Sequence, residues 1–269
     1  MSVEAIVLLI LLGVAVGAVG TLVGAGGGFL LTPVLLVVYP HDSPQTITAI
    51  SLAAVWANST SGSLAYARQR RIDFRSGLVF GLATLPGAVG GALLVDDVPR
   101  RAFDVVMAVA LASVALLIAL RGEGAKVRTA GTLRTVVDRT GREWRYRVPL
   151  GRGVVYSVGV GFASSFLGIG GGVFHVPILV AGLGFPTHIA TATSHFVLSL
   201  MSGAGALTHA AQGSYRIGHG LRRSLALGGG VAVGAQAGAR VSTRVPAKQI
   251  ERLLAVSLTL VAVRLVFAA

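Results

Sequence analysis

The stretch GAGGGFLLTP occupies residues 24–33, and a matching stretch, GIGGGVFHVP, occupies residues 168–177. Each lies inside a long apolar run. Glycine and proline are poor residues for a helix interior, and hydrocarbon offers no partner for a backbone group that a break leaves unpaired. Matched breaks in two halves of an apolar chain indicate a substrate site where the halves meet. The sequence therefore predicts a membrane transporter.

The composition is that of a membrane protein. Of the 269 residues, 54% are hydrophobic and 12% are charged, whereas a soluble domain carries roughly 25% charged residues. Several apolar runs are long enough to cross about 30 Å of hydrocarbon. One run begins close to the N-terminus, where Glu4 stands in place of the basic residues that open a signal peptide. We therefore expect a retained helix there.

The net charge of +13 is explained by membrane topology. The basic residues lie between the apolar runs, where they orient a membrane protein, so we expect a lipid bilayer and no nucleic acid as partner. The chain has no cysteine, which excludes disulfides, thiolate nucleophiles and zinc–thiolate sites. We expect neither a metal nor a cofactor.

The similarity between the halves extends beyond the breaks. Residues 62–65 resemble 205–208, and residues 86–92 resemble 233–239. Internal duplication of this size is typical of secondary transporters. We predict an all-α polytopic membrane protein with about eight transmembrane helices in two four-helix repeats, each with a glycine-rich, broken first helix. The expected units are an N-terminal membrane repeat at 1–120, a cytoplasmic linker at 121–150 and a C-terminal membrane repeat at 151–269.

Each half has four predicted spans. They lie at residues 4–38, 46–66, 76–95 and 101–120, and at residues 153–180, 187–211, 223–241 and 249–267. The first is too long for one straight crossing, because about 35 helical residues would extend beyond roughly 50 Å. A full helix, a glycine break and a half-helix that ends near Tyr39 fit better.

Charge placement predicts the orientation. The connections at 66–76, 121–152 and 213–223 carry several basic residues each and are expected in the cytoplasm, whereas those at 39–45 and 181–187 carry none and are expected outside. Eight crossings then place both termini in the cytoplasm of a multi-pass protein and make the two repeats parallel. The basic residues at 240–252 do not fit this arrangement, because eight crossings would place them outside the cell.

The central linker has a strand pattern. Two stretches, at 132–137 and 142–148, are rich in Thr, Val, Trp and Tyr, and the turn sequence Asp138-Arg139-Thr140-Gly141 lies between them. This pattern predicts a small β-hairpin. It is either an ordered linker or a regulatory arm.

The glycine breaks are the first candidate binding residues. Gly26, Gly27 and Gly28, and Gly170, Gly171 and Gly172, expose backbone N–H groups that no side chain shields. If helical segments begin at Phe29 and Val173, these N–H groups and the helix dipoles favour an anion. The alternative is that the glycines let membrane helices pack closely.

Hydroxyl and imidazole side chains are the other candidates. Ser51 and Ser194 sit at matched places, where they either bind an oxyanion or bond to the preceding turn of their own helix. His188, His195 and His209 share a heptad seam with Ser202, and His175 lies within the second break. An intramembrane histidine either carries a coupling proton or hydrogen-bonds between helices. Asn58 and Gln236 are expected to join helices.

The paired breaks, the prolines that follow them and the stretch Ala192-Thr193-Ser194-His195-Phe196 resemble the TauE/SafE family of sulfite exporters. The resemblance covers almost the whole chain. It implies an inner-membrane carrier for sulfite, sulfoacetate or a related organosulfonate or carboxylate. Matched by motif, the residues that would line the site are Gly26, Gly27, Gly28, Pro33, Ser51, Gly170, Gly171, Gly172, His175, Pro177, Ser194 and His195.

The two copies differ where the second has a histidine. In the alignment of the copies, Leu31 matches His175 and Leu52 matches His195. A proton route would therefore belong to one half only.

The favoured function is a secondary transporter of a small anion, and the alternative is a passive anion channel. An intramembrane enzyme is disfavoured, because the chain lacks cysteine, mid-span carboxylates and a serine–base pair of diagnostic spacing. The oligomeric state is open.

Overall fold

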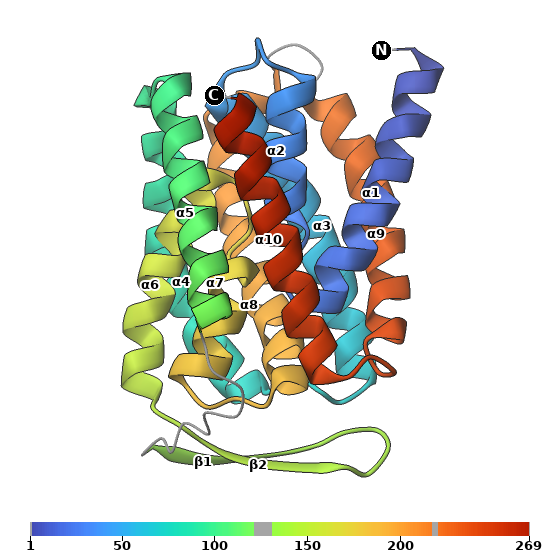
Figure 1. The fold of residues 1–269 in the computed structure, drawn as a ribbon, viewed down its shortest axis with the longest axis vertical. Coiled ribbons are helices and arrows are strands. Elements are labelled where there is room, and N and C mark those ends of the chain that lie inside the picture. Colours follow the sequence, from blue (N-terminus) through green and yellow to red (C-terminus); the bar gives the residue numbers. More distant parts are fainter. Residues whose placement is uncertain (1, 121–130, 217–219, 269) are drawn as a thin grey trace.

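The structure, a computed structural model, describes residues 2–120, 131–216 and 220–268. Long helices run side by side, and a β-hairpin lies across one end of them (Figure 1). The N-terminal part contains α1 Val3–Val23, α2 Gly28–Val38, α3 Pro44–Arg68, α4 Phe74–Leu94, a 3-10 turn Val95–Asp97, and α5 Arg100–Leu120. The hairpin consists of β1 Thr132–Val137 and β2 Glu143–Val148. The C-terminal part contains α6 Leu150–Leu167, α7 Gly172–Pro177, a π-helical segment Ile178–Gly182, α8 Thr187–Ala211, a 3-10 turn Ser214–Arg216, α9 Gly220–Val241 and α10 Ala247–Ala268.

Local sequence signals account for where the long helices begin. The Ser43 side chain caps α3 by accepting from the Thr46 backbone N–H at 3.2 Å, and Pro44 occupies the first turn. Asp73 caps α4 in the same way by accepting from the Ser76 N–H at 3.1 Å. The predicted spans after each break agree with the observed helices to within a few residues.

The molecule has two ends, which side-chain contacts define. At the first, here called the Asp42 end, residues 39–43 contact Arg100 at the start of α5 and Arg223 near the start of α9. At the second, the hairpin end, the connection 69–73 contacts Tyr146 of β2 and the residues that follow α9. Both chain termini lie at the end opposite β1 and β2 (Figure 1).

Helices α1 and α2 form a helical hairpin that enters and leaves at the Asp42 end. Helix α1 runs parallel to α9, since residues 10, 14 and 18 lie against residues 230, 234 and 238 in that order. The chain then reverses, so that Gly27 lies against Gly20 and Val16 of α1. Helix α2 returns to Tyr39 at the Asp42 end.

Helix α6 and the segment 172–182 form a second hairpin, which enters from the hairpin end. Helix α6 runs parallel to α4, because residues 158 and 162 lie against Gly87 and Gly91. After the break the chain returns to Phe185, whose ring lies 4.8 Å from that of Tyr146 in β2. The two helical hairpins therefore enter from opposite ends.

These hairpins correct the predicted topology. Eight crossings in parallel repeats would require each broken first segment to continue across the membrane, but each doubles back. The start of α1 and the described part of the linker, residues 131–150, consequently lie at opposite ends (Figure 1), so they cannot both be cytoplasmic as predicted. The basic residues at 240–252 lie at the hairpin end with those of 66–76, whereas the connection before α9 lies at the Asp42 end.

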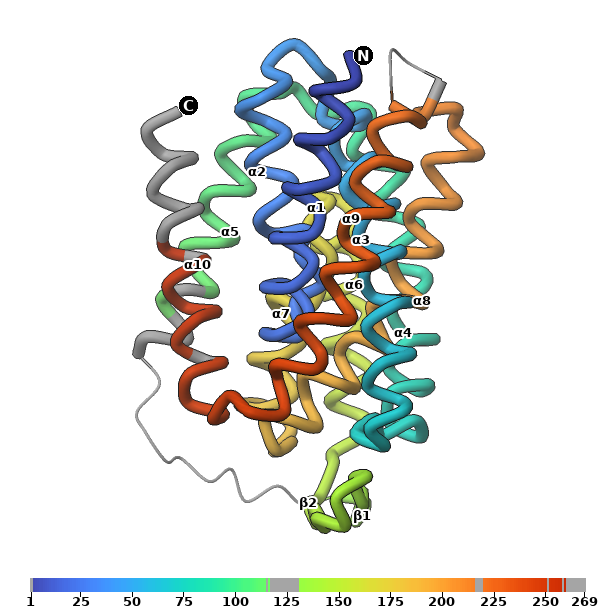
Figure 2. Tube along the Cα trace, turned by 90° about the vertical axis from the view of Figure 1, so that its right-hand side faces the viewer, coloured from blue at the N-terminus to red at the C-terminus, as the bar shows by residue number. Residues whose placement is uncertain are grey.

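The helices form two groups around the short segments. Helices α5 and α10 pack together on one side, and α3, α4, α8 and α9 lie on the other, with α2 and α7 between them (Figure 2). Among the described residues, three helices are long and apolar enough to cross a membrane by length and composition alone: Val3–Val23, the helical stretch Phe74–Asp97 and Leu150–Leu167. Helices α3 and α8 carry many buried polar side chains. These two helices pack against each other, and Ser59 and Ser202 meet between them at 3.4 Å.

The β-hairpin is present where the strand pattern predicted it, with antiparallel pairs from Thr132 opposite Val148 to Val137 opposite Glu143. Its inner face packs on the helix ends, since the Trp144 ring lies 6.1 Å from that of His188. The first ten residues of the predicted linker, 121–130, lie outside the described residues.

Candidate functional site

The glycine breaks reverse the chain through left-handed backbone conformations. Gly24 and Gly168, which end α1 and α6, have φ values of 79° and 67°. Gly26 and Gly170 have φ values of 76° and 63°. L-residues with a side chain rarely adopt such angles. Glycine is therefore required at equivalent positions of both breaks, and this requirement accounts for the repeated motif.

The two breaks contact each other in the interior. A Cβ atom on Gly28 would overlap the carbonyl oxygen of Ile169 in the second break, and one on Gly172 would overlap the Gly24 carbonyl and the backbone of Ala25 in the first. Glycine at 28 and 172 thus allows backbone to approach backbone. The structure brings all the predicted glycines together, and each of them is buried.

The half-helices that follow the breaks begin at this contact and diverge. Helix α2 runs toward the Asp42 end and α7 toward the hairpin end (Figure 2), so their N-terminal ends face each other. Among the described residues, no backbone acceptor pairs with the N–H groups of Gly28 and Phe29 or of Gly172 and Val173. Unpaired N–H groups and converging helix dipoles favour negative charge at this point.

Hydroxyl groups fix the carbonyl groups of the breaks. Ser194 of α8 donates to the Gly24 carbonyl at 3.1 Å. The Thr32 hydroxyl of α2 lies 2.8 Å from the Gly168 carbonyl and 2.8 Å from Oγ of Ser51. Each break is therefore held by a residue of the other half. Ser51 and Ser194 do not bond to their own helices; they support the breaks, Ser51 through Thr32.

His195 belongs to a buried polar cluster beside the end of α1. Its Nε2 atom lies 3.2 Å from Oγ1 of Thr21, whose hydroxyl donates to Oδ1 of Asn58 at 3.2 Å. The Tyr66 hydroxyl donates to the Thr21 carbonyl at 2.7 Å, and its ring stands edge-on to the imidazole. All four side chains are fully buried. This cluster joins α1, α3 and α8 next to the first break.

His175 lies elsewhere, on the side of α7 that faces α6 and α4. Its Nε2 atom lies 3.5 Å from Oγ of Ser157, and its ring stands edge-on to Phe80. The structure gives it no contact with His195, so the two predicted histidines occupy separate places. Pro33 lies buried inside α2, and Pro177 ends α7 where the helix widens into its π-helical turn.

The histidine seam of α8 contacts a different neighbour at each step. His188 packs on Trp144 of the β-hairpin, Ser202 meets Ser59, and His209 lies 3.4 Å from Oγ1 of Thr48. The seam therefore contacts β2 at His188 and α3 at Ser202 and His209.

Sequence reasoning missed the apolar residues at the contact between the breaks. Methyl groups of Val55 in α3 lie next to Gly26, Gly28 and Gly170, and Leu198 of α8 lies next to Gly26. An ordinary valine in an apolar helix carries no signal of such a place. Thr32 was also missed, although a polar side chain directly before Pro33 in an apolar stretch is visible in the sequence.

Formal charge is absent from the buried interior around the breaks. Among the described residues, the buried charged side chains are Arg71 and Asp73, and both lie at the hairpin end. No group of His, Asp and Glu that could hold a metal occurs in the described part of the chain. The arrangement offers an anion neutral donors and helix dipoles, without a cationic side chain.

Two broken helical hairpins that meet inside a bundle of apolar helices define an α-helical membrane protein of the transporter type. The family model for the sulfite exporter TauE/SafE matches residues 9–265, so the chain belongs to this family. The relatives bear the names of membrane transporters and not of enzymes, as predicted.

Three relatives illustrate the similarity. The probable membrane transporter protein YunE of Bacillus subtilis is 29% identical over 97% of both chains. A probable membrane transporter protein of Xylella fastidiosa is 30% identical over 72% of this chain and 70% of its own. Another, of Methanocaldococcus jannaschii, is 26% identical over 75% and 71%. No solved structure shows significant similarity to the chain.

Proposed function

We propose that this protein is a secondary transporter that moves a small anion, such as sulfite, sulfoacetate or a related organosulfonate or carboxylate, across the cell inner membrane. The observation that carries the proposal is the contact between the two breaks, where the N-terminal ends of α2 and α7 converge. The proposed site comprises the six glycines of the breaks with Pro33, Ser51, Pro177, Ser194 and His195, and His175 borders it from the α6 side.

The arrangement of the halves supports alternating access. We infer that residues 1–120 and 151–269 form repeats related by an axis in the membrane plane, since α1 packs on α9 as α6 packs on α4. Inverted repeats of this kind typically hold the substrate at mid-membrane between discontinuous helices. Movement of α3, α4, α8 and α9 relative to α5 and α10 would expose the breaks to one end at a time.

We propose that the hairpin end faces the cytoplasm. The connections 66–76 and 131–152 and the residues after α9 together concentrate the basic residues at this end, as the positive-inside rule requires of the cytoplasmic side. At the Asp42 end, Arg100 and Arg223 are paired with Asp104 and Asp42. The termini would then lie outside, in contrast to the sequence-based prediction.

The proposal is tested by alanine at the contact between the breaks. Gly28→Ala and Gly172→Ala each insert a methyl group against a backbone carbonyl of the other break. Overpacking of this kind costs about 1–3 kcal/mol and displaces the backbone. We expect both variants to insert into the membrane but to lose saturable uptake in proteoliposomes, measured for sulfite, sulfate, thiosulfate, sulfoacetate, taurine and small carboxylates.

The matched control is Gly229→Ala in α9, where an added Cβ meets no atom within 4 Å. This variant should transport at the wild-type rate. Uptake that survives in Gly28→Ala and Gly172→Ala would reject the breaks as the site. Counterflow separates a carrier from the alternative, a passive anion channel, because only a carrier exchanges labelled for unlabelled substrate at saturation.

A further inference from the structure

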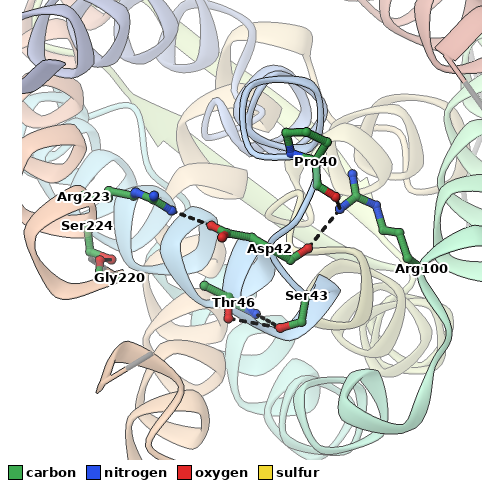
Figure 3. A network of polar contacts seen from close by, with 8 residues as sticks. All are labelled: Pro40, Asp42, Ser43, Thr46, Arg100, Gly220, Arg223 and Ser224. Atoms are coloured by element: carbon green, nitrogen blue, oxygen red, sulfur yellow. Dashed lines mark hydrogen bonds and ion pairs between the residues drawn. The ribbon is translucent and has the colours of Figure 1, made fainter. Parts of the chain in front are cut away.

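A network of charged side chains holds the connection between α2 and α3 at the Asp42 end (Figure 3). The Arg223 guanidinium of α9 donates from Nη1 to Oδ2 of Asp42. Its central carbon lies 3.7 Å from the centroid of the Tyr39 ring. The Arg223 side chain is only 14% exposed and that of Asp42 28%. Partial burial makes it costly to leave either charge without a partner.

In the same network, most N–H groups of Arg100 donate to acceptors within the protein. Its Nε atom donates to both carboxylate oxygens of Asp104 at 3.0 Å. Its Nη2 atom donates to the Leu36 carbonyl at 2.8 Å, and Nη1 donates to the Asp42 carbonyl at 3.0 Å. Arg100 therefore holds the C-terminal end of α2 against α5 and acts as a positioning residue.

The hydrogen bond to Asp42 engages only part of the donor groups of Arg223. Asp42 accepts from Nη1 alone, and Nε of Arg223 is buried without a hydrogen-bond partner among the described residues. A guanidinium presents parallel N–H groups that fit two oxygens of one oxyanion. The Tyr39 ring fixes the plane of this guanidinium. A free oxyanion would satisfy Arg223 more completely than Asp42 does.

We propose that Arg223 is a binding site for small oxyanions at the Asp42 end, and that an oxyanion opens this end by displacing the Asp42 carboxylate. This inference rests on the proposed transport function. Loss of the Asp42–Arg223 pair releases the α2–α3 connection from α9, while Arg100 still holds it to α5. Opening therefore separates α9 from the connection and uncovers the first turn of α3.

Cysteine labelling measures this opening directly, because the chain has no natural cysteine. Ile47→Cys places one thiol in the first turn of α3, where the side chain is fully buried. In nanodiscs, we expect Asp42→Asn, which keeps the size and removes the charge, to raise the rate of maleimide labelling about tenfold. In the Ile47→Cys protein, sulfate, sulfoacetate or acetate, titrated against gluconate at constant ionic strength, should raise the rate in a saturable way.

Two further variants separate the binding role of Arg223 from a structural one. Arg223→Lys keeps the charge that pairs with Asp42 but loses the fork of N–H groups, so labelling should stay slow and the response to oxyanions should disappear. Asp97→Asn removes an exposed carboxylate at the same end and should change nothing. The proposal is overturned if Asp42→Asn leaves labelling slow, or if none of the three oxyanions acts, or if they act equally on Arg223→Lys.

Labelling does not depend on transport. Failure of uptake together with oxyanion-dependent labelling would reject the transport function and retain the site at Arg223. Uptake without oxyanion-dependent labelling would retain the transport function and reject the site at Arg223.

Discussion

At the residue scale, the glycines of the breaks have two separate structural roles. Gly24, Gly26 and Gly168 supply positive φ angles that turn the chain. Gly28 and Gly172 instead remove the side chain where the two breaks touch. The sequence predicted the position of both breaks because the two glycine runs occur at matched places of the halves and each is followed by a proline. It could not predict the direction of the chain afterwards, since a glycine run permits a kink as well as a reversal.

Hydroxyl groups that cross between the halves should stabilise the breaks. Ser194→Ala removes the donor to the Gly24 carbonyl, and Thr32→Val removes the donor to the Gly168 carbonyl. A buried acceptor left without a partner costs about 1–3 kcal/mol. We expect both variants to unfold at a lower temperature than the wild type in detergent.

Ser199→Ala is the matched control, because the Ser199 hydroxyl bonds to the Phe196 carbonyl of its own helix. Its thermal midpoint should stay close to that of the wild type. Equal midpoints for Ser194→Ala, Thr32→Val and Ser199→Ala would show that the hydroxyls do not support the breaks.

At the element scale, the β-hairpin forms an arm attached to the helix ends by a buried hydrogen bond. The Tyr146 hydroxyl donates to Oδ2 of Asp73 at 2.9 Å, and Nε of Arg134 lies 3.8 Å from the same oxygen. Burial and the Asp73 carboxylate both raise the pKa of Tyr146, so the phenol keeps its proton and remains a donor at physiological pH.

Removing this hydroxyl should loosen the arm. Tyr146→Phe loses a hydrogen bond to a charged group, which is worth roughly 1.5–3 kcal/mol. Backbone amide hydrogen exchange in β1 and β2 should accelerate, while exchange in α3 and α8 should not change. Thr135→Ala, an exposed position in β1, should leave exchange as it is. Unchanged exchange in Tyr146→Phe would mean that ring packing alone holds the arm.

The strand pattern predicted this arm from local sequence, because a β-hairpin needs only alternating strand residues and a turn. The docking of the arm is a tertiary feature and was not predictable. The contact of Trp144 with His188 joins residues from two segments whose spatial relation depends on the whole topology. The contact between His195 and Thr21 could not be predicted for the same reason.

At the scale of the whole molecule, the orientation of the two helical hairpins decides the topology. The boundaries of the predicted spans were close to those observed, but a span that doubles back has the same hydropathy as one that crosses. The basic residues at 240–252 carried the only sequence signal against eight crossings. In the structure they lie at the hairpin end together with Arg71, whereas Arg222 and Arg223 at the start of α9 lie at the Asp42 end.

Single cysteines test this orientation in intact cells. We expect Asp97→Cys, at the Asp42 end, to react with an impermeant maleimide added outside. Arg139→Cys, in the turn of the β-hairpin, should react only after the membrane is permeabilised, because the proposed orientation places the basic hairpin end in the cytoplasm. Reaction of both residues from the outside, or of Arg139→Cys alone, would contradict the proposed orientation.

The central claim is that the two breaks form one site which opens alternately to each end. Ala25→Cys places a small thiol at the contact between the breaks, where Ala25 is fully buried. The decisive measurement is its labelling by an impermeant maleimide added to one side of oriented proteoliposomes, and then to the other, under transport conditions. The account predicts slow labelling from both sides and protection by any transported anion that does not react with maleimide. Labelling from one side only, or none from either side while transport continues, would contradict it.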